Sequence, residues 1–184
     1  MLRGERVVLR PIERGDAARL WELIDDFDVR SRADDRPPLP RSRTEAVAEF
    51  DEDPSSAGPD RAWFAVEVDG ELVGICGLHG IDHYHGIGDL GIRLGKEYWG
   101  KGFGQDACRT IVEYAFRHLN LHKVGLEVLA DDERAVGAYR AAGFVEEGRL
   151  RQQNWFDGAH RDTLLMAVLR DEWPPLGPGG RPVG

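Results

Sequence analysis

Apolar and polar positions alternate most clearly in two pairs of short segments. Residues 63–68 and 71–76 flank Asp69-Gly70, and a closing strand over 163–169 follows Asp157-Gly158. An Asp-Gly dipeptide between alternating segments is typical of a β-hairpin with a tight turn. The pattern therefore predicts two antiparallel hairpins. A further strand over 89–94 is predicted after a connection over 79–88 that is rich in His and Gly.

Other segments repeat their apolar positions every three or four residues, as an amphipathic helix does. Asp16 and Asp132 stand in N-cap positions, Ser42 and Glu45 have the spacing of a capping box, and Gly143 can end a helix. The sequence predicts helices over 17–24, 46–50, 105–119 and 133–142, and further strands at 7–9, over 124–128 and from Phe144. This order of elements predicts the α+β class with a mixed sheet.

Length and composition fit one well-cored domain, because the chain has 184 residues, of which 41% are hydrophobic and 31% charged. We expect that domain to cover residues 1–173, and residues 174–184, rich in Pro and Gly, to form a disordered tail. No run approaches the roughly 20 apolar residues that span a membrane. Residues 1–10 do not resemble a signal peptide, so we expect a cytoplasmic protein.

The chain is acidic, with 24 basic and 33 acidic residues and a net charge of -9. This balance disfavours binding to nucleic acid or to an anionic membrane and favours a cationic substrate. An early acidic run consists of Asp25, Asp26, Asp28, Asp34 and Asp35. Such a run is usually a solvated surface. Cys76 and Cys108 are too few for a disulfide scaffold and are expected to be reduced thiols in the core.

A glycine-rich loop follows the strand predicted over 89–94. Residues 95–98 lead into Trp99-Gly100-Lys101-Gly102-Phe103-Gly104 and then into the helix predicted over 105–119. Glycines let successive backbone N–H groups point into one concavity, and the helix N-terminus adds about half a positive charge. The loop is therefore predicted to bind phosphate, with Lys101 adding positive charge at its rim.

The same loop matches a second pattern. Gly102, Gly104 and Ala107 fit G-x-G-x-x-A, and Glu127 lies near the spacing of a ribose-binding acid, as in an NAD(P)-dependent oxidoreductase. Such a loop should follow the first strand of a βαβ series, whereas an antiparallel hairpin precedes this one. The spacing excludes a Walker A loop.

Several motifs, taken in order, resemble the Gcn5-related N-acetyltransferases (GNAT). Residues 99–104 resemble their pyrophosphate loop, and the run from Asp132 through Tyr139 to Gly143-Phe144 resembles their Asn-x-x-Ala…Tyr…Gly-Phe helix. Leu9-Arg10-Pro11 and Trp155-Phe156-Asp157-Gly158 extend the likeness to about residues 5–173. The chain is most similar to the RimJ/RimL-like branch, which includes bacterial spermidine N-acetyltransferases. Trp99 stands where the general motif has Gln or Arg, and Asp132 where it has Asn.

The resemblance implies a GNAT-type mixed, mostly antiparallel sheet flanked by helices. It also implies acetyl-CoA as co-substrate and direct attack by a primary amine in a ternary complex. Tyr139 would be the general acid for the coenzyme thiolate, and Gly91 suits a bulge that opens the strand. Backbone groups of that strand would pair with the pantetheine arm. The residues expected to bind the cofactor are Ile92, Arg93, Leu94, Gly100, Lys101, Gly102, Phe103, Gly104, Gln105, Asp132, Ala135 and Tyr139.

Two acids could accept the proton of the amine. Asp89 matches an acidic position often seen in this branch, and Glu127 lies on the neighbouring predicted strand. Each can equally be a solvated or paired structural carboxylate. The histidines of the connection, His79, His83 and His85, lack a Cys or carboxylate at ligand spacing, so we expect no metal.

The sequence leaves the acceptor amine open. Asp34-Asp35 resembles a region that receives polycations in the spermidine branch, which makes a polyamine a candidate beside a protein N-terminus and other small cationic amines. The acyl group can be acetyl or succinyl. A non-catalytic acyl-CoA-binding module is a further alternative. By analogy with relatives we expect a homo-oligomer, a dimer or larger.

Overall fold

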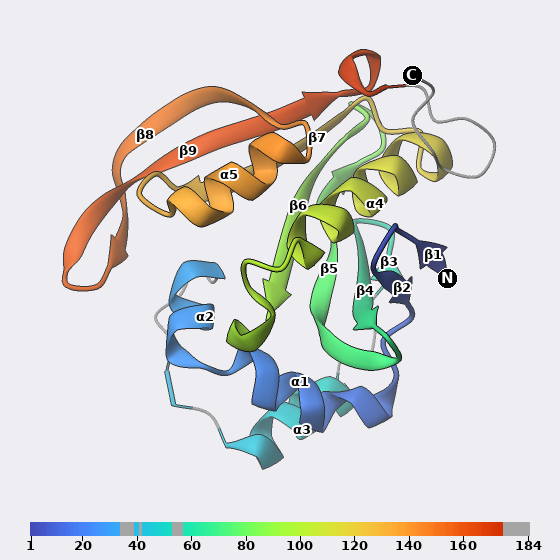
Figure 1. Ribbon diagram of the computed structural model, residues 1–184, viewed down its shortest axis with the longest axis vertical. Helices are drawn as coiled ribbons and strands as arrows, with labels where there is room; N and C mark the ends of the chain where they lie inside the picture. Colours follow the sequence, from blue (N-terminus) through green and yellow to red (C-terminus); the bar gives the residue numbers. More distant parts are fainter. Residues whose placement is uncertain (34–38, 41, 53–56, 175–184) are drawn as a thin grey trace.

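A mixed sheet of nine strands forms the centre of the computed structural model, which describes residues 1–33, 39–40, 42–52 and 57–174 (Figure 1). The strand order is β1-β2-β4-β5-β6-β7-β9-β8, with β3 paired to β4. All neighbours are antiparallel except β6 and β7, which are parallel. The strands are β1 (Leu2–Arg3), β2 (Val8–Arg10), β3 (Ala57–Gly58), β4 (Arg61–Val68), β5 (Glu71–Asp82), β6 (Ile87–Leu94), β7 (Lys123–Leu129), β8 (Val145–Phe156) and β9 (Ala159–Leu169). The predicted α+β class is confirmed.

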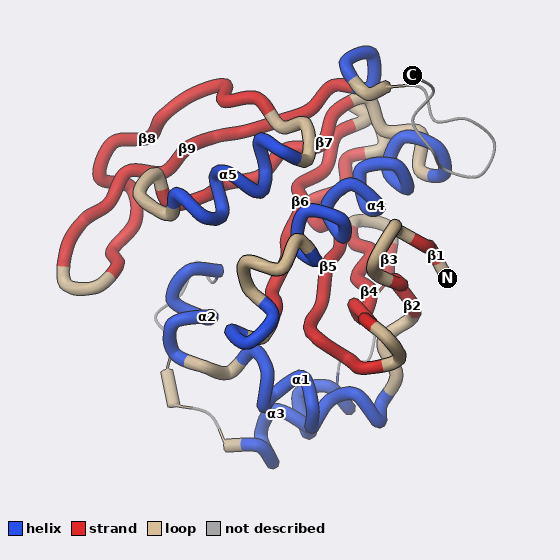
Figure 2. The backbone as a smooth tube through the Cα atoms, in the orientation of Figure 1, coloured by secondary structure: helices blue, strands red, loops and turns tan. Residues whose placement is uncertain are grey.

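Both predicted hairpins are present. Asp69 and Gly70 have φ angles of 51° and 82°, and Asp157 and Gly158 have 46° and 75°, so each turn uses the left-handed region that Asp-Gly tolerates. The strands are longer than predicted, because β5 runs on to Asp82 and takes up part of the His- and Gly-rich connection. Figure 2 shows the β8–β9 hairpin extending beyond α5, away from the first strands.

Helices α1, α3, α4 and α5 lie at the predicted places, and the Ser42–Glu45 capping box that predicts α3 is formed at 2.7 and 3.2 Å. Helix α2 was not predicted, because its segment is charged and lies in a stretch rich in acid and proline. Asp16 precedes α1 without capping it, since its carboxylate binds Arg10 at 2.7 Å instead. The described helices are α1 (Ala17–Ile24), α2 (Phe27–Ala33), α3 (Arg43–Glu52), α4 (Phe103–His118) and α5 (Glu133–Ala141).

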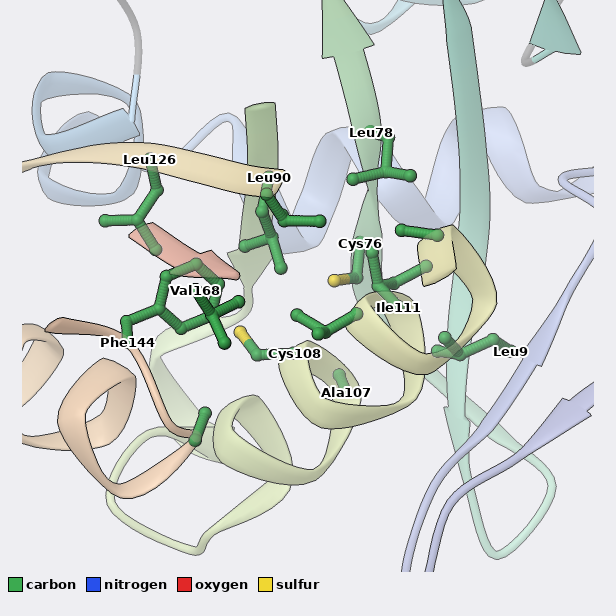
Figure 3. Close-up of a cluster of buried hydrophobic side chains, with 14 of the residues drawn as sticks. Leu9, Cys76, Leu78, Leu90, Ala107, Cys108, Ile111, Leu126, Phe144 and Val168 are labelled. Atoms are coloured by element: carbon green, nitrogen blue, oxygen red, sulfur yellow. The ribbon is translucent and has the colours of Figure 1, made fainter. Parts of the chain in front are cut away.

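Helix α4 packs on one face of the sheet and α1 on the other. The α4 side contains the main core, which Figure 3 shows in part: Leu9, Cys76, Leu78, Leu90, Ala107, Cys108, Ile111, Leu126, Phe144 and Val168. The α1 side holds a smaller cluster of Leu20, Leu23, Ala65 and Leu72. Both cysteines are buried free thiols, as predicted, and burial raises the pKa of Cys76 well above its usual value.

The parallel pair of β6 and β7 is short. Cα partners run only from Ile87 and Lys123 to Asp89 and Gly125, after which the two strands diverge (Figure 1). A Cβ atom at position 125 would lie 2.7 Å from Oδ1 of Asp89, so the glycine makes room for this carboxylate at the end of the pairing. The rest of β6 keeps β5 as its partner on one side and has an open edge on the other.

Gly91 does not form the predicted bulge. It pairs in register with Gly77 of β5, and the irregularity between β5 and β6 lies elsewhere, between His79 and Asp82. A Cβ atom at position 91 would lie 2.5 Å from Cη2 of Trp63, so this glycine is needed for the indole of β4. The opening of the sheet arises on the β7 side instead.

None of the helices in the described ranges is long and apolar enough to cross a membrane. The tail predicted over 174–184 falls, apart from residue 174, outside the described residues.

A carboxylate in the first turn of α4 anchors the N-terminal segment. Asp106 accepts hydrogen bonds from the backbone N–H groups of Glu5, Arg6 and Val7 at 3.0, 2.7 and 2.9 Å. A Cβ atom at Gly4 would lie 2.5 Å from Oδ2 of the same carboxylate, so the turn closes tightly around it. The contact joins residues about a hundred positions apart, which is why sequence periodicity does not indicate it.

We expect Asp106→Ala to lower the free energy of unfolding by about 2 kcal/mol, because three N–H groups lose a charged acceptor. Urea unfolding measures the change. Glu113→Ala is the matched control on the same helix. It removes only the pair with Arg117 at 2.6 Å and should cost about 0.3–0.5 kcal/mol. Equal losses in the two variants would contradict the anchoring role.

Candidate active site

The loop between β6 and α4 presents a row of backbone N–H groups. Gly100 and Gly102 take left-handed φ angles of 70° and 83°, and α4 begins at Phe103. Within the described part of the chain, the N–H groups of residues 100–105 donate no hydrogen bond. Together with the positive end of α4, these donors form the kind of concavity that binds a phosphate or pyrophosphate.

Arg6 holds this loop from the N-terminal segment. Its Nη1 donates to the carbonyl oxygen of Lys101, and its Cζ lies 4.6 Å from the ring centre of Phe103. A Cβ atom at Gly102 would lie 2.9 Å from the same Nη1, so a glycine is needed there for space as well as for its φ angle. No pattern in the sequence indicates this role of Arg6, because the partners are 95 positions apart.

Trp99 ties the loop to β6 and α5. Its Nε1 donates to the carbonyl oxygen of Leu94 at 2.8 Å, and Cζ of Arg134 lies 4.2 Å from its ring centre. The residue that stands in place of the usual Gln or Arg therefore has a structural role here. Lys101 is exposed at the rim, as predicted, with Nζ 5.6 Å from the ring centre of Tyr98.

Backbone groups of β6 face the open edge at alternate residues. The N–H of Gly95 donates to Val73 of β5, so the backbone groups of Arg93, in phase with it, also face β5. Those of Leu90, Ile92 and Leu94 face the side from which β7 has diverged. Arg93 therefore does not offer the backbone pairing that we predicted for it. Ile92 offers both its N–H and its carbonyl to a ligand at this edge. Leu94 offers only its N–H, because its carbonyl already accepts a hydrogen bond from Trp99.

Asp132 begins α5 with the predicted cap. Its Oδ1 accepts from the N–H of Ala135 at 3.0 Å, and its Oδ2 pairs with Arg32 of α2 at 3.0 Å and with Arg134 at 3.4 Å. The carboxylate is buried, and these partners occupy both of its oxygens. Its ion pair with Arg32 links α2 to the start of α5. This contact could not be read from the sequence.

Tyr139 lies on the side of α5 that faces the core. Its ring meets Phe144 edge to face at 6.0 Å, and it packs against the cluster that contains Cys108. Burial, with a further contribution from the nearby thiols, raises the pKa of Tyr139 above its usual range, so the hydroxyl is protonated at neutral pH.

Near the start of α4, Nε2 of Gln105 donates to the carbonyl of Ala141 at 3.1 Å and ties α4 to α5.

Asp89 and Glu127 lie on the opposite face of the sheet. Leu90 and Leu126 point toward α4, so the alternation of a strand directs Asp89 and Glu127 away from it. Both side chains are exposed and neither has an ion-pair partner in the described part of the chain. The structure therefore separates the predicted acid from the two predicted bases, with the opening between β6 and β7 joining the two faces.

The early acidic run is largely neutralised where it is described. Asp25 pairs with Arg30 at 3.2 Å, and Lys96 pairs with both Asp26, at 3.1 Å, and Asp28. Asp34 and Asp35 lie outside the described residues.

No group of three or more His, Cys, Asp or Glu side chains that could hold a metal occurs in the described ranges.

The geometry does not fit a dinucleotide site. The loop follows β6, which is antiparallel to β5, rather than the first strand of a βαβ series. Glu127, the proposed ribose acid, lies on the face away from α4 and its loop. The oxidoreductase alternative is therefore wrong.

Comparison with known proteins gives consistent matches. A family model described as an acetyltransferase (GNAT) domain matches residues 6–145. The chain is 31% identical to the putative ribosomal N-acetyltransferase YdaF of Bacillus subtilis (strain 168), covering 92% of this chain and 94% of that protein. It is also 31% identical to the spermidine N(1)-acetyltransferase of Escherichia coli (strain K12), covering 91% and 88%.

Among solved structures, the spermidine N-acetyltransferase from Vibrio cholerae in complex with CoA and spermine is similar, with a TM-score of 0.80 and 28% identity. The match covers 91% of this chain and 97% of that one.

We expect Gly102→Ala to weaken the affinity for coenzyme A about tenfold, because a left-handed φ at a residue with a Cβ costs about 1–2 kcal/mol and the Cβ displaces Arg6. Isothermal titration measures the affinity. Gly70→Ala is the matched control, since Gly70 has φ 82° and open space around it in the β4–β5 turn. The same loss of affinity in both variants would contradict a specific role for the loop.

Proposed function

The chain belongs to the GNAT acetyltransferase family and is an N-acetyltransferase, and we propose that acetyl transfer takes place at the opening between β6 and β7. The single observation that carries this proposal is that the backbone donors of the glycine loop continue into the free backbone groups on the open edge of β6. The N–H groups of residues 100–105 suit a pyrophosphate, and the open edge of β6 at Ile92 and Leu94 leads from them to the opening.

These residues fit acetyl-CoA, which supplies the acetyl group as an activated thioester. Ile92 and the N–H of Leu94 would pair with the amide groups of the pantetheine arm as a neighbouring strand does. The remaining expected contacts come from Gly100 to Gln105 and from Ala135 and Tyr139 on α5. Asp132 would act by fixing the start of α5, because its oxygens are already engaged.

Tyr139 would protonate the departing coenzyme thiolate. The side chain faces the core side of the opening, and its raised pKa keeps the proton on the hydroxyl until it is needed. On the other face, Asp89 or Glu127 would accept the proton of the amine, directly or through water. Placing donor and acceptor of protons on opposite faces suits direct attack in a ternary complex.

The acceptor would be a primary amine. Relatives are named as spermidine N-acetyltransferases and as a putative ribosomal N-acetyltransferase, which supports a polyamine or a protein N-terminus as classes to test. The carboxylates of Asp89 and Glu127 at the opening suit the positive charge of an ammonium group.

We expect Tyr139→Phe to lower kcat for acetyl transfer about 10²- to 10⁴-fold, because the general acid is lost. The affinity for coenzyme A should stay within twofold, since only an oxygen atom is removed. Thiol release and isothermal titration measure the two quantities. Unchanged kcat would contradict the assignment, and thiol release from no amine in the wild type would favour a non-catalytic binding module.

The direction of the pKa shift of Tyr139 predicts how kcat depends on pH. A general acid works below its pKa, and that of Tyr139 lies above the usual value of about 10. We therefore expect kcat of the wild type not to fall between pH 8 and about pH 10. An alkaline fall centred near pH 8 would contradict Tyr139 as the acid.

The proton acceptor is tested by a matched pair. Asp89→Asn and Glu127→Gln each remove one charge from the same face, and only the variant at the accepting residue should lose about 10²-fold in kcat/KM. If neither variant loses activity, both carboxylates are structural and water accepts the proton.

We also propose that the chain is a homo-oligomer. The outer edge of β8, which ends the described sheet, supports association through that strand, and the mass in solution by light scattering tests it.

A further inference from the structure

The indole of Trp63 lies across two glycines in the middle of the sheet. Trp63 of β4 pairs with Gly77 of β5, which pairs with Gly91 of β6. A Cβ atom at Gly77 would lie 3.0 Å from Cδ2 of the indole, and one at Gly91 would lie 2.5 Å from Cη2. The ring therefore spans both glycines, and its six-membered edge reaches β6.

This edge ends beside the opening. Gly91 lies two residues after Asp89, where the pairing with β7 stops, and on the same face as that carboxylate. The ring of His79 stacks on the indole with centroids 6.0 Å apart and an interplanar angle of 8°. Trp63 is only half-buried, and its indole N–H has no hydrogen-bond partner among the described residues. An aromatic surface is thus left accessible next to the proposed reaction centre.

Among the residues that the structure describes, few unpaired negative charges lie near this place. Asp25 is paired with Arg30, and Asp26 and Asp28 are paired with Lys96. Asp89 and Glu127, near the opening, have no ion-pair partner among the described residues. A polyamine carries a charge on each amino group and needs several such carboxylates along its length. An indole with two carboxylates better suits a single ammonium attached to an apolar body.

We propose that Trp63 is the floor of the acceptor subsite and that the acceptor is a monoamine with an apolar or aromatic group close to the amine. The indole would contact the apolar body, and Asp89 or Glu127 would attract the ammonium. The proposal rests on the proposed function, because it places the acceptor on the face opposite α4. It assigns Trp63 a role in specificity and none in proton transfer.

The test uses amines of defined chemistry on the full chain. Phenethylamine and leucinamide are the monoamine probes, and spermidine is the polyamine probe. Each is titrated into the complex with coenzyme A by calorimetry and assayed as an acceptor by thiol release from acetyl-CoA. The variants are Trp63→Phe, which keeps an aromatic face, and Trp63→Leu, which removes it. Trp155→Leu is the matched control, because Trp155 is 66% exposed in the terminal hairpin.

The wild type should bind phenethylamine and leucinamide more tightly than spermidine. Trp63→Leu should weaken the binding of both monoamines about tenfold, the loss of an aromatic contact of roughly 1.4 kcal/mol, and Trp63→Phe about two- to threefold. KM for acetyl-CoA should stay within twofold in every variant. Retained coenzyme A affinity shows that a variant is folded, and Trp155→Leu should match the wild type.

Two results would overturn the proposal: equal monoamine affinity in wild type and Trp63→Leu, or tighter binding of spermidine than of either monoamine. Calorimetry separates this failure from failure of the proposed function. If the amines bind and respond to Trp63 but none is acetylated, the subsite stands and the catalytic assignment fails. If the amines are acetylated and substitution of Trp63 changes neither their binding nor their acetylation, the catalytic assignment stands and the subsite proposal fails.

Discussion

The early divergence of β6 from β7 is the constraint on which the rest of the site depends. A parallel pair that continued along both strands would satisfy the backbone of β6 on both sides and leave no passage through the sheet. Pairing stops at Asp89 and Gly125, where the carboxylate occupies the space above the glycine. Backbone donors and acceptors beyond this point need another partner, because leaving such groups buried and unpaired is costly. A ligand that lies along β6 like a neighbouring strand can form these missing hydrogen bonds.

The local features of the fold could be predicted from the sequence. Asp-Gly turns, the Ser42 capping box and the Asp132 cap depend on residues within a few positions of one another, and the structure contains all of them. The glycine loop was also predictable, because its backbone conformation and the helix behind it are set locally. The family resemblance then supplied the class of reaction, which the comparisons support independently.

Contacts between distant positions could not be predicted in this way. Gly91 suggested a bulge, since a glycine within a strand often marks one, whereas its actual reason is an indole two strands away. Arg6 and Asp106 join the first residues to α4, and Arg32 joins α2 to Asp132. Asp89 and Glu127 were grouped correctly on neighbouring strands. Only the structure shows that they lie on the face opposite the helix of Tyr139 and have no ion-pair partner within the described ranges.

The tie between residues 5–7 and Asp106 also has a consequence for the order of folding. These partners are 99 to 101 positions apart, so the phosphate loop cannot gain its support until α4 has been synthesised. During translation the β4–β5 hairpin can form early, because its contacts are local and close quickly. Strand β2 can pair with β4 in the same period, whereas the N–H groups of residues 5–7 gain their carboxylate acceptor only when the first turn of α4 has emerged from the ribosome. The turn at residues 5–7 is therefore completed after the strands that flank it in the sheet, and the phosphate loop receives its support from Arg6 at that same late stage.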